Sequence, residues 1–124
     1  MLICDYVITE HETGKKSLIG IFETISARQF PIIHHALSVY VKLTDANGLY
    51  KFQLDLVDLP NDNVVNKCEI PNELQIKNPL KSSELVFNLH GLKFPHAGEY
   101  EFRIYANGRI FGQKSFLVSE VKKN

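Results

Sequence analysis

A chain of 124 residues has the length of one domain, and at that size folding buries roughly two-thirds of the surface of the extended chain. We therefore expect one domain over residues 1–124, with a core that needs neither metal nor disulfide. The 14 basic and 14 acidic residues give no net charge, and the scattered lysines argue against nucleic acid as a partner.

The first third of the chain predicts two strands and a crossover. Alternation indicates a strand over Ile3–Thr9 and a turn over His11–Lys16. Apolar residues of both parities in Ser17–Thr24 predict a strand that is buried on most of its length. Pro31 cannot donate to a sheet, so we place a crossover over Ser26–His35, with room for one helical turn.

Two apolar rows follow, and a short polar segment over Thr44–Gly48 separates them. This pattern is typical of a β-hairpin whose two strands share one buried face. The rows are Leu37, Val39, Val41 and Leu43, and then Tyr50, Phe52, Leu54 and Leu56.

The stretch Leu59–Ser83 is polar and contains three prolines. A structureless loop of this length is unusual in a small domain, so we expect short edge strands near Val64–Ile70 and Glu73–Ile76. Alternation returns with a further strand at Leu85, Phe87 and Leu89.

Asn107-Gly108 predicts a second hairpin, because both residues tolerate the positive φ of a two-residue type I′ turn. On its first strand Tyr100, Phe102 and Ile104 form the inward row. The turn sets Tyr105 opposite Ile110 and Ile104 opposite Phe111. Phe111 and Phe116 then have opposite parities, which predicts a bulge over Gly112–Ser115.

Seven to nine short strands without a long helix predict an all-β fold, an antiparallel β-sandwich. The run Gly98-Glu-Tyr100-Glu-Phe102 resembles the tyrosine corner of immunoglobulin-like sandwiches. Phe102 stands where antibody domains have a cysteine, and the chain has no tryptophan. The resemblance therefore implies an immunoglobulin-like or fibronectin-like architecture without the disulfide.

A second resemblance covers nearly the whole chain. Four segments carry it, namely Ile3-Cys4-Asp5-Tyr6, the run from Thr13 to Phe22, Phe30-Pro31 and Gly98-Glu-Tyr100. Together they resemble a family of small bacterial or phage domains of unknown function. That family has no assigned activity, so the resemblance implies a bacterial or phage source and transfers no chemistry.

Several residues could carry chemistry, but each has a simpler interpretation. Gly14-Lys15-Lys16-Ser17 ends like a phosphate-binding loop, yet it lacks the earlier glycine and the following helix. His34-His35 would point to opposite faces of a strand, which argues against one shared metal ion, although His90 and His96 could join them.

Nucleophilic and acid–base chemistry have equally weak signals. Cys4 lacks a recognised local signature and is typical of a small buried residue, although pairing with a histidine stays open. Carboxylate pairs such as Asp55/Asp58 and Glu10/Glu12 are ordinary for a surface with this many acids. We predict no catalytic, cofactor or metal site and no enzyme.

The N-terminal segment has no basic region, and Asp5 interrupts its apolar run, so it is not typical of a signal peptide. No window is apolar enough for a membrane span. We expect a cytoplasmic protein with no membrane partner, in which Cys4 and Cys68 are free thiols.

Three residues predict a contact surface: Tyr105 and Ile110 as an outward cross-strand pair, and Tyr40 on the polar parity of its strand. The leading hypothesis is a non-enzymatic interaction or assembly module that binds a protein partner or a second copy. Two alternatives stay open. One is an enzyme or small-ligand binder whose loops lie around Phe30–His35 and Leu59–Ser83, and the other is a phage or secretion-system structural component.

Overall fold

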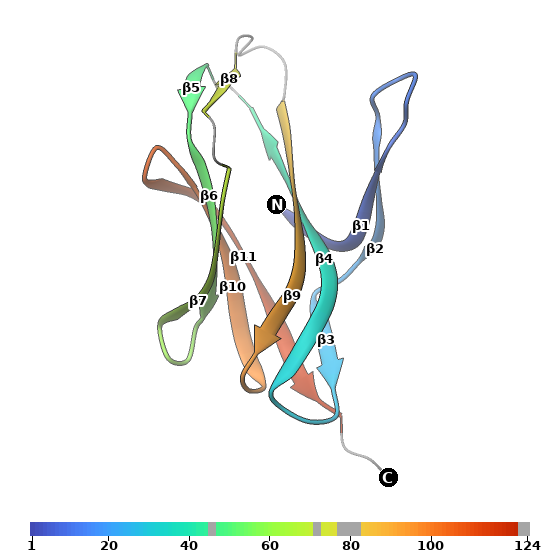
Figure 1. The fold of residues 1–124 in the computed structure, drawn as a ribbon, viewed down its shortest axis with the longest axis vertical. Coiled ribbons are helices and arrows are strands. Elements are labelled where there is room, and N and C mark those ends of the chain that lie inside the picture. Colours follow the sequence, from blue (N-terminus) through green and yellow to red (C-terminus); the bar gives the residue numbers. More distant parts are fainter. Residues whose placement is uncertain (45–46, 71–72, 77–82, 122–124) are drawn as a thin grey trace.

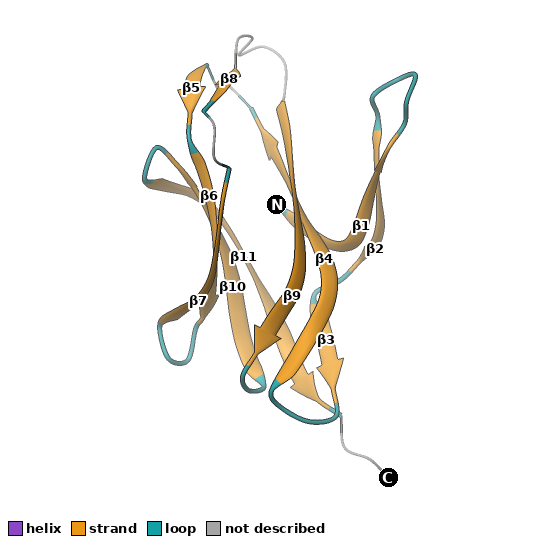
Figure 2. Ribbon diagram, in the orientation of Figure 1, coloured by secondary structure: helices purple, strands orange, loops and turns teal. Residues whose placement is uncertain are grey.

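The computed structural model describes residues 1–44, 47–70, 73–76 and 83–121 (Figure 1). Within these ranges the protein is all-β, with no helix (Figure 2). The described residues form eleven strands, more than the seven to nine expected. They are β1 (Leu2–Thr9), β2 (Lys16–Ile21), β3 (Thr24–Ala27), β4 (Ile32–Leu43), β5 (Gly48–Tyr50), β6 (Phe52–Asp58), β7 (Asn63–Glu69), β8 (Leu74–Ile76), β9 (Ser83–Phe94), β10 (Gly98–Ala106) and β11 (Arg109–Glu120).

The described strands form three sheets. A four-stranded sheet has the order β2-β1-β4-β9, and a five-stranded sheet has the order β3-β11-β10-β6-β7. The short strands β5 and β8 pair separately at one end of the molecule. Pairing is antiparallel except between β3 and β11, which run parallel. The expectation of purely antiparallel sheets is therefore wrong at this one pair.

The core lies between the inner faces of the two larger sheets. Val39 and Phe87 contribute from the four-stranded sheet, and Leu54 and Phe102 contribute from the five-stranded sheet. Phe116 stacks on Phe102 with ring centroids 5.3 Å apart. These side chains are almost completely buried, which is the alternation that two packed sheets require.

The hairpin predicted between the rows at 37–43 and 50–56 is wrong. Both rows are largely buried as expected, but β4 pairs with β1 and β9, whereas β6 pairs with β7 and β10. The chain crosses from one sheet to the other between β4 and β6, and residues 45–46 of the predicted turn lie outside the described residues. Alternation reveals a buried face but does not reveal which strand lies beside it.

The predicted strand over Ser17–Thr24 is also wrong in burial and extent. The structure divides this region into β2, an edge strand with mostly exposed side chains, and β3, which joins the other sheet. Leu18 and Ile19 have opposite parities within β2 itself, and Ile25 enters the core from β3. The crossover over Ser26–His35 contains no helical turn, because β3 extends to Ala27 and β4 begins at Ile32.

The hairpin at Asn107-Gly108 is confirmed, with φ values of 51° and 81° at the two turn residues. Tyr105 pairs with Ile110 as expected, but Ile104 pairs with Gly112. Phe111 is therefore the extra residue of the bulge, next to the predicted range of Gly112–Ser115. The bulge returns the chain to the parity that buries Phe116.

The two edge strands predicted in the polar stretch are confirmed as β7 and β8. β7 forms one edge of the five-stranded sheet, and β8 pairs with β5. Residues 71–72 and 77–82, which include two of the three prolines, lie outside the described residues.

Candidate functional surfaces

The three residues predicted to form a contact surface do not lie together. Tyr105 and Ile110 are cross-strand neighbours in the five-stranded sheet. Tyr40 lies in β4 of the other sheet, where its hydroxyl donates to the Glu84 carboxylate. Burial, together with this hydrogen bond, raises the pKa of Tyr40 to about 12, so the phenol stays protonated. Tyr40 therefore belongs to a different surface.

Exposed apolar side chains instead gather on the hairpin made by β1 and β2. Alternation places Leu2, Tyr6 and Ile8 on one face of β1, opposite to the face of Ile3, which enters the core. We call Leu2, Tyr6, Ile8, Ile19, Ile21 and Tyr40 the hairpin face.

The register joins these side chains into one surface. Tyr6 is the cross-strand neighbour of Ile19, and Leu2 is the neighbour of Tyr40. Cys4 lies between them, opposite Ile21, and is fully buried. Side chains directly opposite each other in a sheet have Cβ atoms about 5 Å apart, so the hairpin face is continuous across three strands. Tyr6 is 52% exposed and Ile21 is 56% exposed.

The hairpin also extends beyond the core. Figure 1 shows β1 and β2 turning away from β4 toward their connecting turn. Register contacts between β1 and β4 are confined to Leu2–Cys4, whereas β1 pairs with β2 as far as Thr9. The outer half of the hairpin is consequently a two-stranded ribbon, a form that is marginally stable in water by itself.

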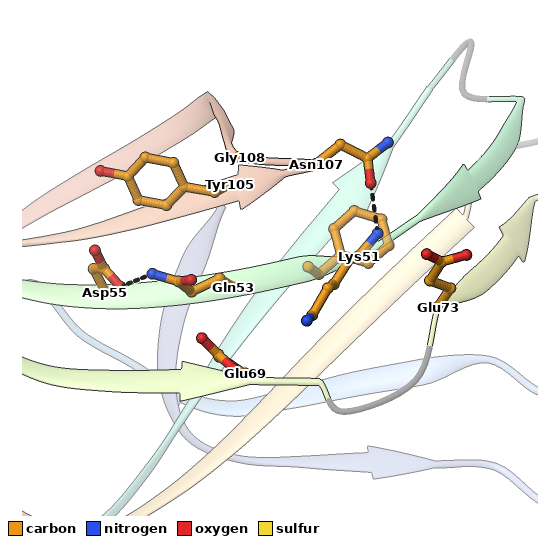
Figure 3. Close-up of a pocket in the computed structure, with 9 residues that line it drawn as sticks. Lys51, Gln53, Asp55, Glu69, Glu73, Tyr105, Asn107 and Gly108 are labelled. Atoms are coloured by element: carbon orange, nitrogen blue, oxygen red, sulfur yellow. Dashed lines mark hydrogen bonds between the residues drawn. The ribbon is translucent and has the colours of Figure 1, made fainter.

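A polar hollow of about 530 Å³ opens on the outer face of the five-stranded sheet (Figure 3). Strands β6, β7 and β10 supply its floor, and the Asn107-Gly108 turn forms one wall. The side chains around it are mostly polar or charged. The described residues that line it are Lys51, Phe52, Gln53, Asp55, Glu69, Glu73, Tyr105, Asn107 and Gly108.

Asn107 fastens the wall of this hollow to the chain that enters β6. Its Oδ1 accepts a hydrogen bond from the backbone N–H of Lys51 at 2.9 Å, and its Nδ2 donates to the Leu49 carbonyl at 3.2 Å. Its own N–H donates to the Lys51 carbonyl at 2.9 Å. One turn residue therefore fixes two separate segments relative to each other.

Asp55 lies at the floor of the hollow and is only 5% exposed, although it belongs to the outer face of the sheet. Its Oδ1 accepts a hydrogen bond from Nε2 of Gln53 at 2.7 Å. Figure 3 shows the other carboxylate oxygen directed away from Gln53. No hydrogen bond joins that oxygen to another described residue.

A second polar cluster lies at the opposite end of β6. Asp58, which is 2% exposed, accepts hydrogen bonds from Nδ2 of Asn61 at 3.0 Å and from Nε2 of His96 at 2.6 Å, both on Oδ2. The other ring nitrogen of His96 lies 2.6 Å from the Ala97 carbonyl oxygen. Tyr100 donates from its hydroxyl to the His96 carbonyl at 2.7 Å, which is the contact expected of a tyrosine corner.

This geometry favours a charged imidazolium. Both nitrogens of His96 face an acceptor, and only the doubly protonated ring can donate to both. The Ala97 carbonyl first, and then Asp58, raise the pKa of His96. Burial alone raises the pKa of Asp58, but hydrogen bonds from Asn61 and His96 outweigh it and leave that pKa below its ordinary value. With both nitrogens engaged, His96 is a structural ion-pair partner rather than a general base.

The other sequence candidates occupy ordinary structural positions. Gly14 has a φ of 71° in the turn before β2, so its segment is a hairpin connection. Burial, followed by the charge of Asp5, raises the pKa of the Cys4 thiol and disfavours the nucleophilic thiolate. Cys4 and Cys68 are both free thiols.

Metal and membrane sites gain no support in the part of the chain that the structure describes. No three His, Cys, Asp or Glu side chains there come together in a way that could hold a metal ion. The described residues also include no helix long and apolar enough to cross a membrane.

Asp55 and Asp58 show what sequence reasoning missed. Considered as a carboxylate pair, they are separated by the structure into the hollow and the His96 cluster. Residues three positions apart on a strand point to opposite faces of the sheet, so the spacing of the two residues was enough to predict their separation. Nothing in the sequence placed His96 beside Asp58.

The fold and these surfaces define a small all-β domain with two packed sheets, an exposed apolar hairpin and a polar hollow. The chain belongs to the family of unknown function DUF6941, whose model matches residues 1–119. Comparison with curated proteins and with solved structures returned no significant match. Family membership agrees with the expected domain of unknown function and carries no activity to this chain.

Proposed function

We propose that this chain is a non-enzymatic interaction module, a single immunoglobulin-like β-sandwich that works in the cytoplasm of a bacterium or as a phage component. The order β11-β10-β6-β7 corresponds to strands G, F, C and C′ of such sandwiches, and β1-β4-β9 corresponds to A, B and E. The hydrogen bond from Tyr100 to the His96 carbonyl supports the same architecture.

The observation that carries the interaction role is the hairpin face. A single exposed apolar residue is ordinary, but contiguous exposed apolar side chains rimmed by polar ones are typical of protein contacts. Tyr6 lies directly opposite Ile19 on the adjacent strand, and Ile21 lies two residues farther along β2 on the same face. A partner that covers them would also stabilise a ribbon that has little core of its own.

Tyr105 and Ile110 form a separate and smaller candidate contact. Ile110 is well exposed, whereas Tyr105 is partly buried beside the hollow. We keep this pair as a predicted secondary surface. The small-ligand binder is the alternative function, because the hollow is within the size range of small-molecule sites.

The test compares the wild type with the double variant Tyr6→Lys, Ile19→Glu. Sedimentation velocity over a wide concentration range measures self-association, and affinity capture from the native host measures binding of other proteins. Ile33→Lys is the matched control, because Ile33 is 71% exposed in β4 and lies outside the hairpin face.

We expect self-association, or capture of a defined partner, in the wild type and the control and its loss in the double variant. A wild type that stays monomeric, with the same captured proteins for all three forms, would contradict the proposed function.

A further inference from the structure

The outward surface of the four-stranded sheet is free of charge where the hairpin face lies. Alternation assigns to it every second residue of β1 from Leu2 to Ile8, of β2 from Ser17 to Ile21 and of β4 from Ala36 to Tyr40. None of these positions is charged, although charged residues make up 23% of the chain. A centre depleted of charge, with a polar rim around it, is the composition of a protein interface.

The apolar area of this surface is close to what a stable dimer needs. Its large exposed side chains, which are 37–56% exposed, are Leu2, Tyr6, Ile8, Ile19 and Ile21. At on the order of 200 Å² for a fully exposed large side chain, they offer roughly 450 Å² of mostly apolar surface on each copy. A standard interface buries about 800 Å² per partner, of which about 60% is apolar. The hairpin face, set against the same face of another copy, therefore supplies the apolar part of such an interface.

Charged residues border this surface at its two ends. Glu10 extends the outward row of β1 toward the β1–β2 turn, and Lys42 extends the outward row of β4 beyond Tyr40. Both are exposed, and no salt bridge joins either of them to another described residue. Glu84, which lies opposite Lys42 on β9, accepts a hydrogen bond from the Tyr40 hydroxyl. The two outward rows thus end in a carboxylate near the turn and in an ammonium group beyond Tyr40.

These two charges select one orientation of two facing copies. In a symmetric dimer a two-fold axis relates the copies, so each contact occurs twice. If the two β1 strands run antiparallel across the contact, Glu10 of each copy approaches Lys42 of the other. If they run parallel, like charges meet at both ends, which is unfavourable. The net charge of zero also leaves no long-range repulsion between copies. The chain is therefore electrostatically complementary to itself in the antiparallel orientation.

A second copy is the partner that these features fit. Building on the interaction role proposed above, we propose that a second copy of this chain covers the hairpin face, in a two-fold dimer whose β1 strands face each other and run antiparallel. Such a contact needs only one patch, because both copies present the same surface. Tyr6 lies in the middle of the outward row of β1, and an aromatic residue at the centre of an interface is its typical anchor.

The test measures dimer formation by the purified full chain in sedimentation velocity, from about 1 μM to about 1 mM. We expect a monomer–dimer equilibrium with a Kd on the order of 1–100 μM. In a mixture of ¹³C-labelled and unlabelled copies, isotope-filtered nuclear Overhauser effects should join the Tyr6 ring to the methyl groups of the partner's Ile8 or the partner's Ile19. Tyr6→Ala should weaken the dimer about thirtyfold, because the central aromatic side chain is lost.

Charge reversal tests the orientation of the two copies. Glu10→Lys and Lys42→Glu should each weaken the dimer about threefold to tenfold, because each creates two like-charge contacts per dimer. The double variant Glu10→Lys, Lys42→Glu restores both pairs, so its Kd should return close to that of the wild type. Glu99→Lys, an exposed residue of β10 in the other sheet, is the matched control and should leave the Kd unchanged. These exposed positions keep the test valid if a substitution at Tyr6 disturbs the ribbon.

A chain that stays monomeric up to about 1 mM would overturn the proposed dimer. So would a dimer whose filtered signals lie outside the hairpin face, or charge reversals whose losses add in the double variant instead of cancelling. The proposed interaction role fails separately. If the wild type is monomeric but a captured protein is lost in the variant Tyr6→Lys, Ile19→Glu, the interaction role stands, the dimer is refuted, and the partner is another protein.

Discussion

Asn107 serves at once as a turn residue and as a clamp, and substitutions can separate the two roles. Asn107→Gly keeps a residue that accepts the φ of 51° but removes the side-chain hydrogen bonds to the Lys51 N–H and the Leu49 carbonyl. Asn107→Ala removes the same two hydrogen bonds and also forces a Cβ into the left-handed region.

The magnitudes of the two effects differ. Each lost hydrogen bond contributes a net 0.5–1.5 kcal/mol, and both are solvent-exposed, so Asn107→Gly should lower the free energy of unfolding by about 1–2 kcal/mol. The left-handed conformation of alanine adds about 1 kcal/mol or slightly more. For a domain of this size, 1 kcal/mol corresponds to a fall in Tm of about 4 °C.

Urea titration followed by far-UV circular dichroism measures these differences, since the chain has no tryptophan. Hydrogen exchange adds a local readout, because the Lys51 amide should lose protection in both variants. Equal stability of the wild type and Asn107→Gly would show that the clamp contributes nothing. Equal stability of the glycine and alanine variants would refute the left-handed conformation.

The remaining predictions concern the end of β6 and the glycines of the first hairpin. His96→Gln should destabilise the protein most below pH 6.5, and the difference in unfolding free energy from wild type should shrink as pH rises through the raised folded pKa of His96. Urea titrations at several pH values measure this difference. A difference that does not change with pH would contradict the prediction. Tyr100→Phe should lower the unfolding free energy by about 1–2 kcal/mol in thermal denaturation, because the buried hydroxyl donates to the His96 carbonyl. An unchanged unfolding free energy would show that the tyrosine corner does not stabilise the fold. Gly20→Ala should destabilise more than Gly14→Ala in the same assay. Both glycines have a φ near 70°, but a Cβ at Gly20 would lie 2.2 Å from a carboxylate oxygen of Asp5, whereas a Cβ at Gly14 would have nothing within 4 Å. Equal losses of unfolding free energy in the two variants would mean that the Asp5 carboxylate moves aside.

Much of the local structure was predictable because strand alternation and turn chemistry are local properties. The inward row Leu37, Val39, Val41 and Leu43 is buried, and Asn107-Gly108 forms its two-residue turn. Even the bulge was predictable in kind, because Phe116 has to face the core. Its position at Phe111 required knowledge of the actual register.

The assignment of strands to sheets was not predictable in the same way. β4 and β6 each have a buried face, and a hairpin or a crossing between sheets produces the same alternation. The hairpin face was missed for a related reason. Ile19 and Ile21 match the pattern of a buried strand, but their register with Tyr6 and Cys4 places them on the face of the sheet opposite to Ile3.

The parallel pairing of β3 with β11 determines when this protein can fold. Thr24 lies beside Leu117, so closing the five-stranded sheet joins segments that are far apart along the chain. Such non-local contacts slow folding, because the entropy of a long loop is lost before the pairing can compensate for it. On the ribosome, β3 has no sheet to join until β11 has emerged. β3 therefore stays without its sheet partner until β11 has been synthesised.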